Sequence, residues 1–124
     1  MNCLDTSALM EIHNGGIHAK RLLEDNSVIP DLILAEFYGL LYRLHGQQTA
    51  EYWIRKLSPF AVHVSRETLF KAVKYRIDRK KEKLSFFDAV GYMYAQEFKL
   101  LFVTCDNDFK GKKGVLLIPS SSRT

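Results

Sequence analysis

The segment Leu100-Leu-Phe-Val-Thr-Cys-Asp-Asn-Asp108 carries the strongest indication of the fold. Its first five residues are uncharged and mostly favour β-structure, so they predict a short strand at 100–104 that is buried on both faces. Asp106 and Asp108 follow where this strand should end. In an open parallel sheet, ligands bind beyond the carboxyl ends of the strands, so at least one carboxylate is expected at a binding site. The alternative is a polar turn, which Asp and Asn often form.

The bulk composition predicts one globular domain that spans residues 1–124. The chain has 124 residues, of which 47% are hydrophobic and 26% are charged. We expect a cytoplasmic protein with reduced thiols, because neither a signal peptide nor a membrane-spanning apolar run is visible and Cys3 and Cys105 make no disulfide framework. The net charge of +4 permits a polyanionic partner without establishing one.

Strand patterns alternate with helix patterns along the chain, which indicates an α/β fold with a parallel sheet. Strands are predicted at Asn2–Leu4, Ser27–Ile29, Phe60–Val64, Leu100–Thr104 and Val115–Pro119. Helices are predicted from Thr6 or Ser7, as the N-cap, to about His13, then at Ile17–Glu24, from Pro30-Asp31 to Gly46, and at Gln47–Leu57, Arg66–Lys83 and 85–98. Residues 120–124 are expected to be a disordered tail.

Glu36 is the one charged residue between Leu32 and Tyr42, in a helix that its apolar pattern predicts to be buried nearly all round. A buried ionised glutamate is costly unless it is paired or binds a metal. We favour a functional role over a contact with an arginine or a helix end.

The helix 66–83 has two faces in the sequence. Leu69, Val73 and Ile77 recur at four-residue spacing and predict an inner apolar stripe. The other face is basic and is the best candidate for an electrostatic footprint on a polyanion, although most charge runs are only solvated surface. It consists of Lys71, Lys74, Arg76, Arg79, Lys80, Lys81 and Lys83.

Topology is expected to bring distant acids to one rim of the sheet. Asp5 and Asp106 each end a strand, and Glu36 lies in the helix that leaves the second strand. Asp88 lies in the first turn of the helix before the fourth strand, although its spacing from Ser85 also suits a capping box. Carboxylates that repel one another in a pocket are stabilised by a divalent cation, and a set of oxygen ligands favours Mg²⁺ or Mn²⁺. Such a site suits metal-assisted hydrolysis of phosphodiesters.

The blocks LDTSALM (residues 4–10), LAEF (34–37) and FDAVGYMYAQEFKLLFVTCDNDF (87–109) resemble PIN domains, most closely the small VapC-type toxins of toxin–antitoxin pairs. The resemblance covers essentially the whole chain. It implies a three-layer sandwich with a central parallel sheet of order 3-2-1-4-5, and a Mg²⁺- or Mn²⁺-dependent endoribonuclease that leaves a 5′-phosphate and a 3′-hydroxyl. It also implies an RNA substrate, a cognate antitoxin and a homodimer.

By this resemblance, Asp5, Asp88 and Asp106 hold the metal, and Glu36 binds a second metal or positions the attacking water. Thr104 orients a carboxylate or water, and Asp108 is an additional, weaker ligand. Thr6 and Ser7 match the small hydroxyl residues after the first acid, whereas Cys105 departs from the commonest pattern. An aromatic helix pair is the expected antitoxin groove, with Phe37 and Ile54 more plausible as core; it comprises Phe37, Tyr38, Tyr42, Trp53 and Ile54.

Other functions remain open from the sequence. A PIN nuclease of RNA processing would have no antitoxin, and an upstream gene for a small DNA-binding protein would separate the two cases. A catalytically inert RNA-binding module is disfavoured, because RNA binding calls for basic side chains rather than buried acids. A receiver-like or haloacid-dehalogenase-like phosphotransfer domain is disfavoured because no second Asp follows Asp5 at two residues.

Overall fold

The computed structural model describes residues 1–16, 21–23 and 26–120. Its sheet is formed by β1 (Asn2–Leu4), β2 (Ser27–Pro30), β3 (Ala61–Val62), β4 (Leu101–Thr104) and β5 (Val115–Leu117). Every pairing between these strands is parallel, and the strand order is β3-β2-β1-β4-β5. The predicted sheet order 3-2-1-4-5 is therefore confirmed, with β1 at the centre between β2 and β4.

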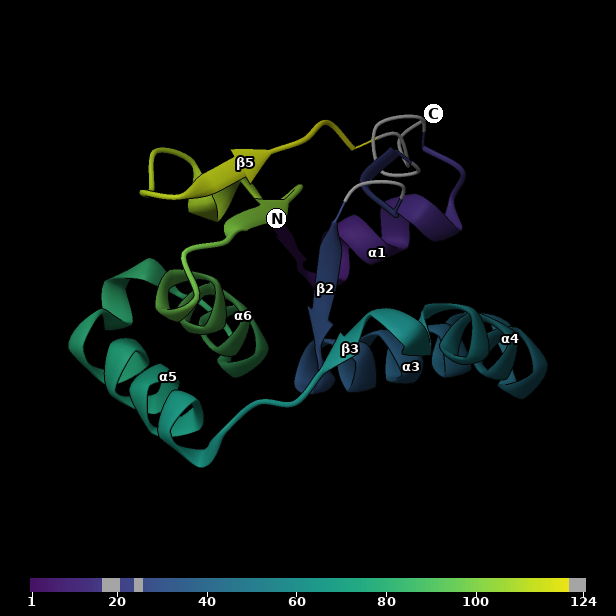
Figure 1. The fold of residues 1–124 in the computed structure, drawn as a ribbon, viewed down its shortest axis with the longest axis horizontal. Helices are drawn as coiled ribbons and strands as arrows, with labels where there is room; N and C mark the ends of the chain where they lie inside the picture. The colour runs from purple at the N-terminus through teal and green to yellow at the C-terminus, as the bar shows by residue number, and fades with distance from the viewer. Residues whose placement is uncertain (17–20, 24–25, 121–124) are drawn as a thin grey trace.

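The helices are α1 (Thr6–His13), α3 (Asp31–His45), α4 (Gln47–Leu57), α5 (Arg66–Asp78) and α6 (Phe86–Glu97), with short 3₁₀ turns at Ser58–Phe60, Lys80–Glu82 and Asn107–Phe109. Figure 1 shows α5 and α6 side by side on one side of the molecule, and α3 and α4 together on the other. Most of the predicted helix Ile17–Glu24 lies outside the described residues; its described part, 21–23, is helical. Of the predicted disordered tail, residues 121–124 lie outside them as well.

Side chains of the central strands point alternately to the two faces of the sheet, so the core consists of two apolar clusters. Leu4 of β1 and Val103 of β4 pack with α1, α3 and α4, whereas Cys3 and Phe102, their neighbours in sequence, pack with α5 and α6. Successive side chains of a strand point to opposite faces, so one sheet separates two helical layers. The predicted three-layer sandwich is thereby confirmed. No helix within the described residues is both long and apolar enough to cross a membrane.

The predicted inner stripe of α5 is wrong in two of its three members. Val73 and Ile77 are 44% and 64% exposed, whereas Thr68 and Ala72 are buried. A four-residue step advances about 40° beyond a full helical turn, so a stripe of this spacing rotates away from a fixed contact. The packing of α5 against α6 decides which face is buried, and it leaves an apolar strip exposed.

The helix that carries Glu36 is also less buried than predicted. Within α3 only Ile33, Phe37 and Leu41 are buried, while Tyr42 and Leu44 are more than half exposed. α3 packs against α1, α4, α6 and the strands β2 and β3, and the face that none of these elements covers remains exposed.

Several predicted boundaries are wrong. The helix predicted to reach Lys83 ends at Asp78, and a 3₁₀ turn follows it. The third strand is two residues long, since Phe60 belongs to a 3₁₀ turn and residues 63–64 lie outside the strand; the fifth strand ends at Leu117. The N-cap of α1 is Asp5 rather than Thr6 or Ser7, so one carboxylate both begins a helix and ends a strand.

Candidate functional site

A cavity of about 440 Å³ lies at the carboxyl-terminal edge of the sheet. Its five carboxylates come from four segments of the chain, since Asp5 caps the helix that contains Glu11; they are Asp5, Glu11, Glu36, Asp88 and Asp106. Asp5 follows β1, Glu36 lies in the second turn of α3 after β2, Asp88 lies in the first turn of α6, and Asp106 follows β4. The parallel sheet brings these segments to one edge, because every strand ends there.

Asp5 is the most buried of these acids, with 2% of its surface exposed. Its Oδ1 accepts hydrogen bonds from Ser7 Oγ at 2.7 Å and from the backbone N–H of Ala8 at 2.9 Å. The pKa of Asp5 is raised to about 6, with burial as the largest cause; hydrogen bonds from Thr104, Ala8 and Ser7 lower it, and the charge of Asp88 adds to the rise. The dominant cause is the loss of water around the charged form.

Asp88 serves the helix as well as the cavity. The backbone N–H of Ser85 donates to Asp88 Oδ2 at 3.1 Å, and the backbone N–H of Asp88 donates to Ser85 Oγ at 3.0 Å, which completes a capping box. Burial, followed by the charges of Asp106 and Asp108, raises the pKa of Asp88. The capping box therefore holds this acid at the rim without removing it from the cavity.

Glu36 contacts a hydroxyl group rather than an arginine or a helix end. Thr6 Oγ1 donates a short hydrogen bond to Glu36 Oε1. Partial burial raises the pKa of Glu36, the Thr6 bond lowers it, and the charge of Asp88 raises it. Since Thr6 lies next to Asp5, this bond ties α3 to the end of β1.

The two acids after β4 occupy different places. Asp106 lines the cavity, and its Oδ1 accepts from the backbone N–H of Asp108 at 2.9 Å. Thr104 is fully buried, and its Oγ1 accepts from the backbone N–H of Asp106 at 3.0 Å. Asp108 is exposed and does not line the cavity, so its side chain contributes charge from outside.

Ser7 connects the two central strands at the site. Besides donating to Asp5, its Oγ accepts from the backbone N–H of Cys105 at 2.8 Å and lies 3.2 Å from Thr104 Oγ1. From the sequence, Ser7 was expected only to be a small residue after the first acid. Its structural role depends on a contact across 98 positions, which no local pattern reveals.

Glu11 is a site residue that sequence reasoning missed. It is 3% exposed, it lines the cavity, and its Oε2 accepts a hydrogen bond of 3.3 Å from Ser120 Oγ. The sequence feature that could have identified Glu11 is its position four residues after Ser7, which places both side chains on the same face of α1.

Replacing Ser7 with alanine is expected to destabilise the fold by about 1–3 kcal/mol, because the half-buried N–H of Cys105 loses its acceptor. Thermal unfolding measures this effect. Ser58→Ala is the matched control, since Ser58 Oγ also bonds to backbone, at Ile54 O, but on an exposed helix end. Equal losses in both variants would contradict the linking role of Ser7.

The donor set fits a hard divalent cation in its chemistry. All the acidic side chains around the cavity offer oxygen, which suits Mg²⁺ or Mn²⁺. Among the described residues, no group of three or more His, Cys, Asp or Glu side chains is arranged to hold a metal ion. Repulsion between carboxylates, which contributes to the raised pKa values of Asp5 and Asp88, opposes their convergence unless a cation neutralises them.

Comparison with known proteins gives the family. The family model of the PIN domain matches residues 3–115. The chain belongs to the PIN domain family. The match spans β1 to the start of β5 and so includes every acid that lines the cavity of this PIN domain. None of the curated proteins compared with the chain matches it significantly.

Solved structures are similar to this PIN domain over nearly its whole length. A chain of a toxin–antitoxin complex from Klebsiella pneumoniae is 26% identical, with a TM-score of 0.73 over 94% of this chain and 96% of that one. VapC20 of Mycobacterium tuberculosis, a toxin that cleaves the sarcin–ricin loop, is 23% identical, with a TM-score of 0.78 over 96% and 100%. FitAcB from Neisseria gonorrhoeae is 13% identical, with a TM-score of 0.70 over 96% and 98%. The last two similarities establish the fold alone.

The residues of the predicted aromatic groove do not form one surface: some are buried in the core and others line a hollow or are exposed. Phe37 is fully buried and Trp53 packs against His13, with ring centroids 5.7 Å apart. Tyr38 and Ile54 line an open hollow of about 300 Å³ between α3 and α4, together with Asp31, Leu34 and Ala35. Tyr42 is 55% exposed and stacks on Tyr38. Ile54, expected to be core, lies at the surface of this hollow.

Proposed function

We propose that this PIN domain is a Mg²⁺- or Mn²⁺-dependent endoribonuclease of the VapC type, the toxin of a toxin–antitoxin pair acting in the cytoplasm. The observation that carries the proposal is the convergence of Asp5, Glu36, Asp88 and Asp106 on one cavity. Acids that repel one another and are partly dehydrated destabilise a fold, and a bound cation offsets this cost. The similarity to a chain of a toxin–antitoxin complex supports the biological role.

In the proposed site, Asp5, Asp88 and Asp106 hold the metal directly or through water. A hard cation bound there would neutralise phosphate charge and lower the pKa of a water molecule. Glu36 would hold a second cation or accept the proton of the attacking water, for which its raised pKa and partial exposure suit it. The products expected from hydrolysis carry a 5′-phosphate and a 3′-hydroxyl.

Hydroxyl groups would keep the acids in place. Thr104 is buried between Asp5 and Asp106, bonding to the backbone of the second and to the side chain of the first. Thr6 similarly orients Glu36. Asp108, which is exposed outside the cavity, would add negative charge and act at most through water.

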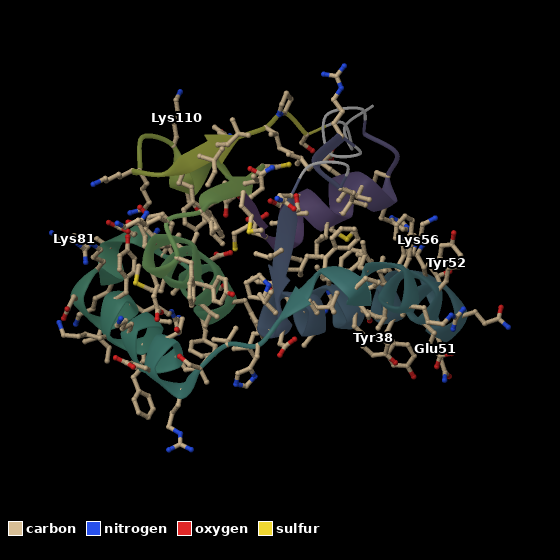
Figure 2. The ribbon with its side chains drawn as sticks, in the orientation of Figure 1. Tyr38, Glu51, Tyr52, Lys56, Lys81 and Lys110 are labelled. Atoms are coloured by element: carbon tan, nitrogen blue, oxygen red, sulfur yellow. The ribbon has the colours of Figure 1, made fainter. Side chains whose placement is uncertain are left out.

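The hollow between α3 and α4 is the proposed contact for an antitoxin segment. Its walls are the side chains of Leu34, Ala35, Tyr38 and Ile54, and Asp31 is an acid at its edge. Figure 2 shows Tyr38 projecting from α3, while Tyr52 and Lys56 project together from α4. A mostly apolar hollow beside exposed tyrosines suits an amphipathic segment. A homodimer, implied by the resemblance, is also proposed.

Incubation of the purified protein with total RNA tests the nuclease. Cleavage is expected with Mg²⁺ or Mn²⁺ and is expected to stop in excess EDTA, and mapping of the ends should find 5′-phosphates. Cleavage that continues unchanged in EDTA would contradict metal dependence, and intact RNA under all conditions would contradict the nuclease itself.

A further inference from the structure

A second cavity, a cleft of about 320 Å³, lies at the carboxyl-terminal end of α5 and the 3₁₀ turn after it. Its cationic side chains are Arg76, Arg79, Lys80 and Lys83, and the exposed apolar residues Val73 and Ile77 form part of its wall. The exposed strip that contradicted the predicted inner stripe of α5 therefore borders a basic cleft.

The charge of the chain is concentrated around this cleft. Residues 66–85 include eight basic and three acidic side chains, a net +5, whereas the whole chain carries +4. Figure 2 shows Lys81 projecting outward from this end of α5. Such a concentration of positive charge on one segment attracts polyanions.

Two of the three local acids are neutralised from outside the cleft. Asp78 pairs with Lys74 at 2.7 Å. Glu82 pairs with Lys112, a largely buried lysine from the loop before β5, and lies 3.8 Å from Arg79. In the part of the chain that the structure describes, Lys80 and Lys83 form no ion pair. Their charges are therefore available to a partner.

The cleft and the acidic cavity are neighbours along the backbone. Leu84 lines the cleft, and the next residue, Ser85, lines the acidic cavity. Arg76 Nε donates to the carbonyl oxygen of Leu84 at 3.0 Å, while the backbone N–H of Ser85 donates to Asp88. Consecutive Cα atoms are about 3.8 Å apart, so the two cavities approach each other at this peptide.

We infer that the basic cleft binds phosphates of the RNA strand next to the bond that is cut; this inference rests on the proposed function. Guanidinium and ammonium groups bind phosphate, and the apolar wall offers contact area to ribose and bases. A symmetric contact with a second copy would place the same positive cleft against itself, which like-charge repulsion disfavours. Charge complementarity therefore selects a nucleic acid strand.

Binding of a fluorescein-labelled single-stranded RNA, followed by anisotropy in EDTA at several salt concentrations, tests the inference without cleavage. The variant Lys80→Gln/Lys83→Asn removes two charges, and asparagine tolerates the left-handed backbone of residue 83, where φ is 58°. We expect affinity to fall roughly tenfold, and the slope of log affinity against log salt to shrink by about 1.4, since each phosphate contact contributes about 0.7.

Arg43→Gln/Arg55→Gln, at exposed positions of α3 and α4, is the matched control and should bind as the wild type does. Lys80→Arg/Lys83→Arg should also retain binding. If the wild type cuts RNA but the neutral variant binds it with unchanged affinity and salt slope, the cleft inference is wrong and the proposed function stands. If the neutral variant differs from the wild type in sedimentation mass but not in RNA affinity, the cleft is instead a contact between two copies of the chain. Wild-type protein that neither binds nor cuts RNA overturns the proposed function itself.

Discussion

Replacement of Asp5 with asparagine is expected to reduce RNA cleavage on the order of a thousandfold, the scale of losing a group that stabilises charge in the transition state. Asp5 lines the acidic cavity at the end of the central strand, and the charge of Asp88 contributes to its raised pKa. Asparagine keeps one oxygen but loses the negative charge that a hard cation requires. Single-turnover cleavage of a labelled RNA in Mg²⁺ measures the change, and Asp106→Asn should show the same loss.

The fold should survive this substitution. Asparagine is as good an N-cap as aspartate, so the bonds from Ala8 and Ser7 can be retained. Circular dichroism and thermal unfolding check the fold, and Glu51→Gln on the exposed face of α4 is the matched control for removing one carboxylate. Cleavage at the wild-type rate by Asp5→Asn would remove the proposed mechanism, whatever the stability of the variant.

Without divalent metal, the protein is expected to be more stable at pH 5 than at pH 7.5. The pKa of Asp5 is about 6 in the fold, against an ordinary value of 3.8 for an exposed aspartate, so the folded state binds its proton more tightly than the unfolded chain does. The stabilisation from this proton is complete below pH 3.8 and is lost as the pH rises through 6. The raised pKa values of Glu36 and Asp88 act in the same direction. For Asp5 the full change is about 3 kcal/mol, of which about half falls between pH 5 and pH 7.5, or roughly 5 °C in Tm for a domain of this size.

Thermal unfolding in EDTA across this pH range measures the effect, and Asp5→Asn is expected to flatten it. Addition of Mn²⁺ at pH 7.5 should raise the Tm of the wild type, because ionised carboxylates bind the cation and the unfolded chain does not hold them together. The increase should be smaller in Asp5→Asn. Equal increases in the two proteins would show that the acidic cavity is not where Mn²⁺ binds.

The fold class could be predicted from the sequence because strands and helices are favoured by residues that lie close together in the chain. Apolar runs such as 100–104 are compatible with a strand covered on both faces, and helices between them require parallel connections. The spacing of Ser85 and Asp88 predicted a capping box, which the structure contains. It did not predict that one carboxylate could serve both the cap and the cavity.

Sequence patterns did not predict burial correctly where it depended on a neighbouring secondary-structure element. The spacing of Leu69, Val73 and Ile77 is equally compatible with several rotations of α5, and contact with α6 selected the one that exposes the last two. The aromatic residues of α3 and α4 were similarly divided by packing, which buried Phe37 and left Tyr42 exposed. Helical periodicity states which residues share a face, whereas the neighbouring element decides whether that face is covered.

The order of strands and helices, and the position of acids after two apolar strands, could be read from the chain because backbone preference and alternation act over a few residues. Three features required the folded molecule: Ser7 bonds to Cys105, Glu11 joins the acidic cavity, and a basic cleft opens one residue away from that cavity. The first two features depend on contacts between residues far apart in the chain, whereas the cleft is lined by residues 73–84 and depends on how the turn after α5 folds against that helix. Their energies come from burial and charge in three dimensions, which the spacing of residues along the chain does not encode.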